Sequence, residues 1–168
     1  MATSLADYTS ASLMIPELRG LRSYEVIQEL CLALQRENRI PDMLPFYHAT
    51  LNHEFLVSSD TEAGMAIPHA PLAGLREPVF AAGRSAEPIY WGAKAMRTVK
   101  LVFLIAMPDT DSTQYLLLIS SLARLSKDEA LMQRLHSVPT GEQMFEILQQ
   151  VKVGTQRATQ KSDKGGDR

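Results

Sequence analysis

The first third of the chain carries two stripes of hydrophobic residues at helical spacing. The first stripe spans about residues 24–36 and predicts a helix with Ser23 as its N-cap. Residues 12–18, before this helix, are expected to form a short strand or an extended segment. The second stripe predicts a helix from the N-cap Asp42 to about residue 55. The side chains expected to face inward are Val26, Ile27, Leu30, Cys31 and Leu34 in the first helix and Leu44, Tyr47, Leu51 and Phe55 in the second.

After residue 57 the pattern changes to small and polar residues interrupted by short apolar runs. Residues 65–67 are expected to form a short strand that stops at a turn made by Pro68 and His69. Residues 79–82 and 89–91 predict two further short strands, and residues 99–107 carry the longest apolar run. A run of that length is typical of a central strand that is covered on both faces.

The last third of the chain is expected to be helical. Residues 115–125 have helical periodicity, Ser126 and Glu129 match a capping box that opens a helix to about residue 135, and Thr140 and Gln143 match a second box. The order of elements indicates an α/β fold: a single domain, over residues 12–152, with a mixed β-sheet flanked by helices. Residues 1–11 are expected to be a flexible N-terminus and residues 153–168 a disordered polar tail.

Composition and charge exclude several classes of function. The chain has 168 residues, is 45% hydrophobic and has a formal net charge of -2, so no global positive field would gather nucleic acid. No apolar run is long enough to cross a bilayer, so we expect no membrane insertion. The single cysteine, Cys31, lies in an apolar stripe and is interpreted as a buried thiol in a reducing compartment. We therefore expect a cytoplasmic protein.

His69 is the histidine with the most informative neighbourhood. It follows Pro68 at the end of a short apolar run, where its backbone is restrained and its ring can be presented at a surface. Neutral imidazole is a good nucleophile toward phosphorus, although a turn histidine without chemistry remains the alternative on this spacing alone. His48 is expected at a helix surface and His136 at a helix end. A zinc site built from His53, Glu54 and His69 lacks the spacing of a metal motif, so no metal and no cofactor are expected.

Three segments resemble a known family. The phrases GMAIPHA, VKLVFLIAMP and YLLLISSLARLSKDEALMQRL, in this order, are similar to enzyme IIA of the bacterial phosphoenolpyruvate-dependent sugar phosphotransferase system, mannitol/fructose class, which includes the nitrogen-regulatory enzyme IIA. The resemblance covers about residues 13–151. It implies a single α/β domain in which His69 accepts a phosphoryl group from the small phosphocarrier HPr.

The resemblance also implies roles for residues around His69, with departures from the family pattern. His53 and Glu54 stand where the family has an Arg-Glu pair, and Tyr115 stands where it has a second histidine. Ser58 and Ser59 could donate hydrogen bonds to phosphoryl oxygens or to nearby backbone. The adjoining loop adds two carboxylates that would repel a phosphoryl group, Asp60 and Glu62.

Two hypotheses follow. The first is a phosphocarrier that accepts a phosphoryl group on His69 from an HPr-like donor and acts, through a sugar-transporter domain or a regulatory target, in sugar uptake or its regulation. The second is a degenerate enzyme IIA-like module that binds protein partners without phosphotransfer. Whether the chain is an enzyme, and whether it forms a homodimer, stays open. The first hypothesis expects His69 in a shallow cleft with His53 and Tyr115 within reach.

Overall fold

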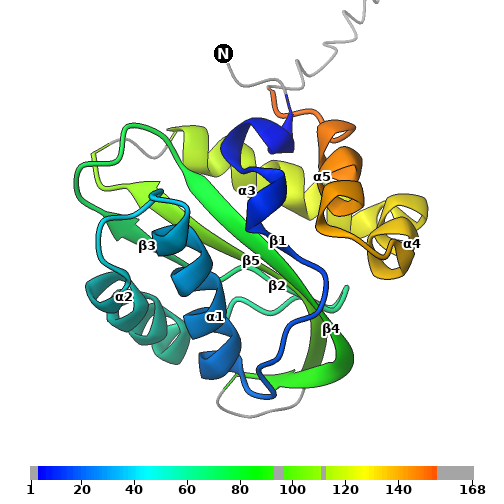
Figure 1. Cartoon of the computed structure of the whole chain (residues 1–168), viewed down its shortest axis with the longest axis horizontal. Coiled ribbons are helices and arrows are strands. Elements are labelled where there is room, and N and C mark those ends of the chain that lie inside the picture. The colour runs from blue at the N-terminus through cyan, green and yellow to red at the C-terminus, as the bar shows by residue number, and fades with distance from the viewer. Residues whose placement is uncertain (1–3, 93–96, 111–112, 155–168) are drawn as a thin grey trace, which may run out of the picture.

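A five-stranded mixed sheet organises the protein (Figure 1). The computed structural model describes residues 4–92, 97–110 and 113–154. The strand order is β1-β4-β5-β2, with β3 also paired with β5. The antiparallel pair β4–β5 forms the middle, while β1 runs parallel to β4, and β2 and β3 run parallel to β5. The strands are β1 (Met14–Ile15), β2 (Met65–Ala66), β3 (His69–Leu72), β4 (Val79–Trp91) and β5 (Arg97–Pro108).

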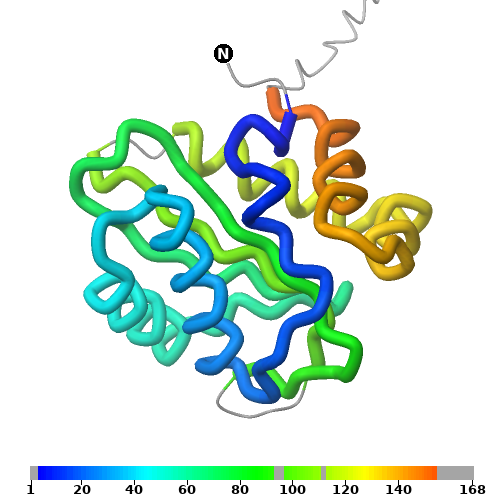
Figure 2. The backbone as a smooth tube through the Cα atoms, viewed as in Figure 1, coloured from blue at the N-terminus to red at the C-terminus, as the bar shows by residue number. Residues whose placement is uncertain are grey.

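Helices pack around this sheet, as the α/β fold class predicts. Helix α1 (Ser23–Arg36) contacts β4 and α2 (Met43–Leu56), and α2 contacts β3. Farther along the chain, α3 (Thr113–Lys127), α4 (Glu129–Ser137) and α5 (Gly141–Gln149) follow one another. Figure 2 shows the N-terminal segment passing beside α5 before the chain reaches α1. No helix of the described segments is long and apolar enough to cross a membrane.

The prediction of a buried central strand is confirmed. Each residue of β5 from Leu101 to Ala106 is 0% exposed, because β5 has neighbours on both edges and side-chain cover on both faces. The prediction of two separate strands at residues 79–82 and 89–91 is wrong. They are the ends of one strand, β4, which stays paired with β5 across a register shift between Arg84 and Ile89.

Tertiary contacts also correct the predicted inward face of α2. Its buried residues are Met43, Phe46 and Thr50, whereas Leu44 is 53% exposed and Phe55 is 80% exposed. This helix has apolar residues on nearly every side, so its periodicity alone does not single out one face. The buried face of α2 is determined instead by its contacts with α1 and β3.

The predicted helix N-termini are partly confirmed. Thr140 caps α5 as expected, with a capping box completed by Gln143, and Asp42 caps α2. Two other predictions are wrong by one or two residues. Arg22 precedes α1 in place of Ser23. Asp128 caps α4, since its carboxylate accepts from the amide of Leu131, while the hydroxyl of Ser126 donates to the carbonyl of Ala123 in α3.

The expectation of a flexible N-terminus is wrong for the part of it that is described. Residues 5–8 and 11–13 form two 3-10 turns that pack against α5. Leu5 and Tyr8 are 0% and 2% exposed, and the amide of Leu5 donates to the carbonyl of Val151 at 2.9 Å. The folded unit therefore starts before residue 12. At the other end Val153 is buried, and the predicted tail from residue 155 lies outside the described residues.

Candidate functional site

His69 is the first residue of β3. The strands β2 and β3 both pair with β5 and are separated only by Ile67 and Pro68. The carbonyl of Pro68 accepts a hydrogen bond from the amide of Ile105 at 2.9 Å, and His69 is the register partner of Ile105. The expected turn at Pro68 and His69 is therefore a break between two strands along one edge of β5. The sheet fixes the backbone of His69, while its side chain remains half-buried.

A hydrogen bond to the backbone sets the tautomer of this histidine. Nδ1 of His69 lies 2.9 Å from the carbonyl oxygen of Ile67. Because a carbonyl oxygen only accepts, Nδ1 carries the proton of the neutral ring, and Nε2 keeps a free electron pair. Nε2 is therefore the atom of His69 that can act as a nucleophile.

The six residues predicted for the site line one cavity of about 600 Å³. The ring of His69 lies between two other rings, with centroid distances of 5.8 Å to His53 and 5.3 Å to Tyr115. Four elements converge here: the last turn of α2, the loop after it, the start of β3 and the first turn of α3. The six predicted residues that line this cavity are His53, Glu54, Ser58, Ser59, His69 and Tyr115.

Glu54 holds the loop that follows α2. Its carboxylate accepts hydrogen bonds from both the amide and the hydroxyl of Ser59, the amide at 3.1 Å. The hydroxyl oxygen of Ser59 in turn accepts from the amide of Ile67 at 3.2 Å. Since the carbonyl of Ile67 also accepts from the ring of His69, Glu54 is connected to that ring through Ser59 and Ile67.

Trp91 is a member of this network that the sequence does not identify. Its side chain is 2% exposed, and its indole N–H donates to Glu54 at 3.2 Å. A buried indole N–H needs an acceptor, but the sequence alone indicates only a strand or core residue. Only the arrangement of β4 next to the end of α2 brings Trp91 and Glu54 together, so no motif could have revealed the contact.

The two serine hydroxyls are already engaged with carboxylates. Ser59 donates to Glu54, and Ser58 donates to Asp60 at 2.5 Å. Each hydroxyl has a single proton, so donation to another acceptor requires that one of these bonds be exchanged. Asp60 thus faces Ser58, while the mostly exposed Glu62 pairs with Arg97 at 3.7 Å.

The cavity has little fixed positive charge. No Arg or Lys lines it among the residues that the structure describes, which leaves His53 beside His69 as the group able to become cationic. Burial raises the pKa of the Tyr115 phenol, so Tyr115 stays protonated and can donate a hydrogen bond at neutral pH. Within the described ranges, no group of three or more His, Cys, Asp or Glu is arranged to hold a metal ion.

The other two histidines lie away from this cavity. His48 is exposed on α2, where its ring is 5.7 Å from that of Tyr47. His136 lies in the last turn of α4 and lines a different cavity. The expected surface and helix-end positions of these residues agree with the structure.

Comparison with known proteins identifies relatives of this chain in sequence and in fold. The family model described as "Phosphoenolpyruvate-dependent sugar phosphotransferase system, EIIA 2" matches residues 8–151. The fructose-specific EIIABC component of Bacillus subtilis is 28% identical over 125 residues, 74% of this chain but only 20% of that protein. The nitrogen regulatory protein of Pseudomonas aeruginosa is 26% identical over 129 residues, 77% of this chain and 84% of that protein.

Solved structures agree at the level of the fold. Nitrogen regulatory protein IIA-Ntr from Neisseria meningitidis has a TM-score of 0.73 at 22% identity, covering 86% of this chain and 98% of that one. IIA mannitol from Escherichia coli has a TM-score of 0.69 at 18% identity, covering 83% and 97%. The resemblance found in the three sequence segments is confirmed.

Proposed function

The chain belongs to the EIIA 2 family of the phosphoenolpyruvate-dependent sugar phosphotransferase system, and on that premise we propose that it is a phosphocarrier that accepts a phosphoryl group on His69. The observation that carries the proposal is the hydrogen bond from Nδ1 of His69 to the carbonyl of Ile67. It leaves the electron pair of Nε2 free in a half-buried ring that lines an open cavity. A protein donor can reach a ring in that position.

In the proposed reaction an HPr-like protein carries the phosphoryl group into the cavity. Nε2 of His69 attacks phosphorus in line, the bond between phosphorus and the donor breaks, and the donor's leaving atom takes that electron pair. Nδ1 keeps its proton throughout, because it stays bonded to the carbonyl of Ile67. No proton has to move from His69 during the step, so the transfer depends on positioning and charge stabilisation.

The neighbours of His69 would stabilise the charge that arrives. A phosphoryl group brings nearly two negative charges, which protonated His53 would partly offset and to which the phenol of Tyr115 would donate. Ser58 and Ser59 are proposed phosphate ligands as well. They would exchange their present bonds to Asp60 and Glu54 for bonds to phosphoryl oxygens.

The proposed partners dock on the rim of the cavity. Phe55, Leu56, Val57 and Leu116 are between 58% and 80% exposed, and they lie at the end of α2 and the start of α3 beside the site. Apolar side chains exposed together favour a protein partner. A solved complex of enzyme IIA mannitol with phosphorylated enzyme IIB mannitol from Escherichia coli has the same fold, with a TM-score of 0.68. We propose a IIB-like domain or a regulatory protein as the next acceptor, and a cytoplasmic setting.

Two observations favour the second function, a regulatory module that binds partners without phosphotransfer. No Arg or Lys of the described residues lines the cavity, and both serine hydroxyls are engaged by carboxylates. The same apolar rim would then serve binding alone.

A phosphorylation assay separates the two functions. The protein is incubated with phosphoenolpyruvate, enzyme I and HPr from the same organism, and phosphate that is labile in acid and stable in base is measured. We expect label on the wild type and on His48→Ala, whose histidine lies outside the cavity, and none on His69→Ala. An unlabelled wild type, next to an active control enzyme IIA in the same mixture, would exclude the phosphocarrier and leave the binding module.

A further inference from the structure

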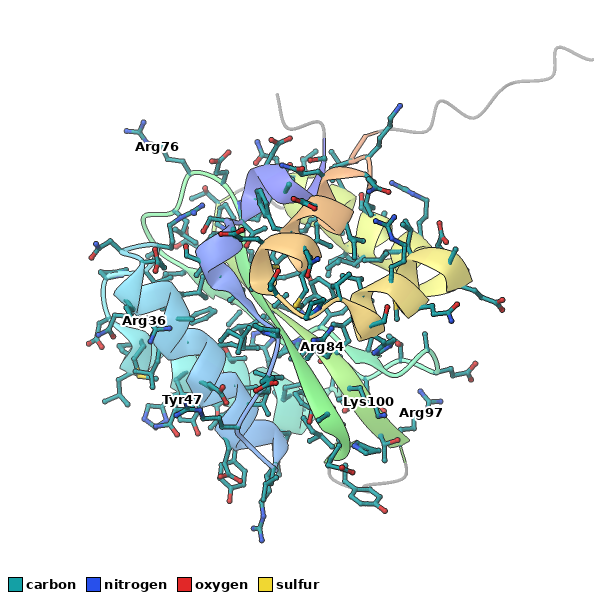
Figure 3. The ribbon with its side chains drawn as sticks, turned by 45° about the vertical axis from the view of Figure 1, so that its right-hand side comes forward. Arg36, Tyr47, Arg76, Arg84, Arg97 and Lys100 are labelled. Carbon is teal, nitrogen blue, oxygen red and sulfur yellow. The ribbon has the colours of Figure 1, made fainter. Side chains whose placement is uncertain are left out.

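A second cavity of about 410 Å³ lies where β4 and β5 meet the end of α4. Three basic side chains line it, namely Arg84 from β4, Lys100 from β5 and His136 from the last turn of α4. None of them lines the cavity of His69. Figure 3 labels Arg84 and Lys100 on this strand pair.

Arg84 is held by three hydrogen bonds and has no ionic partner among the residues that the structure describes. Its Nη1 donates to the carbonyls of Leu135 and Val138 at 2.7 and 2.6 Å, and its Nε donates to the carbonyl of Pro16 at 3.2 Å. These three bonds leave the two N–H groups of Nη2 without a partner among the described residues, and no carboxylate of those residues lies within 4.0 Å. The guanidinium is therefore preorganised, and part of its donor edge is available to a ligand.

Lys100 and His136 add positive charge beside it. Lys100 precedes Leu101, the register partner of Arg84, and its ammonium also lacks an ion pair within the described ranges. Partial burial, then the charges of Lys100 and Arg84, lower the pKa of His136. Both cations are therefore close enough to the imidazole of His136 to disfavour its protonated form. The carboxylate of Glu17 lines the same cavity but lies more than 4.0 Å from either of them.

We propose that this cavity binds a small phosphate-type oxyanion between Arg84, Lys100 and His136. A dianion would accept hydrogen bonds from the Nη2 edge and neutralise two cations that have no ion pair within the described part of the chain. The cavity is also of the size that proteins use for small ligands, roughly 300 to 1,000 Å³. Glu17 and the carbonyls around Arg84 offset part of the positive potential, so we expect a Kd of about 1 mM.

The proposed anion site is separate from His69. Lys100 lies five positions before Ile105, the register partner of His69, which corresponds to about 17 Å along β5. An anion at Lys100 therefore does not touch the ring of His69. The proposal does not depend on phosphotransfer, and the two sites can be occupied at once.

The test follows the ring protons of His136 by NMR while inorganic phosphate is added to the full chain at constant pH and ionic strength. We expect a saturable shift for His136, a higher pKa of His136 in saturating phosphate, and no saturable shift with chloride. Lys100→Gln should weaken binding about fivefold, because one charge contact is lost. Arg97→Gln, an exposed cation on the same strand outside the cavity, should leave the Kd unchanged, as should His69→Ala.

Three outcomes would overturn the proposal. The first is a shift of His136 that is linear in phosphate or reproduced by chloride, which indicates screening alone. The second is an unchanged Kd in Lys100→Gln with a native circular dichroism spectrum. The third is a response confined to His69 and lost in His69→Ala, which places phosphate binding at the first cavity only. Arg84 is left intact throughout, because its bonds to three carbonyls also support the fold.

Discussion

The ring of His69 is tied to the carbonyl of Ile67, two residues earlier, at 2.9 Å. The amide of Ile67 donates to the hydroxyl oxygen of Ser59, and that hydroxyl donates to the carboxylate of Glu54. The same carboxylate also accepts from the indole N–H of Trp91. The orientation of the His69 ring thus depends on a chain of hydrogen bonds through two strands, a helix and a loop. The contributions of Glu54 and Trp91 to this chain of hydrogen bonds can be measured through protein stability, separately from phosphotransfer.

Glu54→Gln is expected to lower the free energy of unfolding by about 1 to 3 kcal/mol. The amide replaces a charged acceptor of three hydrogen bonds with a neutral side chain, in which one of the two acceptor atoms becomes an NH₂ donor. Urea unfolding measures the change. Glu62→Gln is the matched control, because that side chain is 91% exposed and should leave the unfolding midpoint in place. Equal midpoints for the two variants would contradict the supporting role of Glu54.

Trp91→Phe is expected to cost about 1 to 2 kcal/mol of stability, since it removes the indole donor to Glu54 and leaves space in a buried position. The neighbouring Tyr90→Phe serves as the control, because Tyr90 is 68% exposed and its loss of a hydroxyl should be nearly neutral. In the ¹⁵N spectrum of the His69 ring, Trp91→Phe should also reduce the population with the proton on Nδ1. An unchanged tautomer population would mean that the chain of hydrogen bonds ends at Glu54.

The pH dependence of stability should carry a contribution from His136. Partial burial and the charges of Lys100 and Arg84 lower its pKa in the folded state, so folding favours the neutral ring. This contribution is present above the ordinary pKa of about 6.5 and is lost as the pH falls toward the folded value. Urea unfolding at a series of pH values should therefore show a shallower acid decline for His136→Gln than for the wild type. An identical pH profile for the two proteins would rule this contribution out.

Cys31 should resist modification in the folded protein. Its side chain is 0% exposed, and burial raises the pKa of the thiol to about 12, so the reactive thiolate is scarce at neutral pH. A chromogenic disulfide reagent should leave the native protein unlabelled and react with one thiol per chain in urea. Rapid labelling without denaturant would indicate an opening of α1 that this packing does not allow.

Local sequence patterns predicted much of the fold because they report local physics. The apolar run at residues 99–107 became the buried β5, and Thr140 with Gln143 formed the expected capping box. The patterns gave wrong predictions where the local sequence is compatible with more than one structure. The helix α2 is apolar on most sides, and the two halves of β4 are separated by a mostly polar segment in which Gly83 and Arg84 still pair with β5 before the register shifts. Contacts with neighbouring elements determine the buried face of α2 and the extent of β4.

The sequence by itself determined the α/β class and the position of His69 after Pro68, because these follow from periodicity and from a motif contiguous in the chain. The residues expected around His69 came from the family resemblance. Tertiary structure alone decided which atom of His69 is free, through the contact with Ile67. It also placed Trp91 behind Glu54 and brought Arg84, Lys100 and His136 to one cavity. Those residues are separated along the chain, and their contacts depend on strand register and helix packing, which no local pattern encodes.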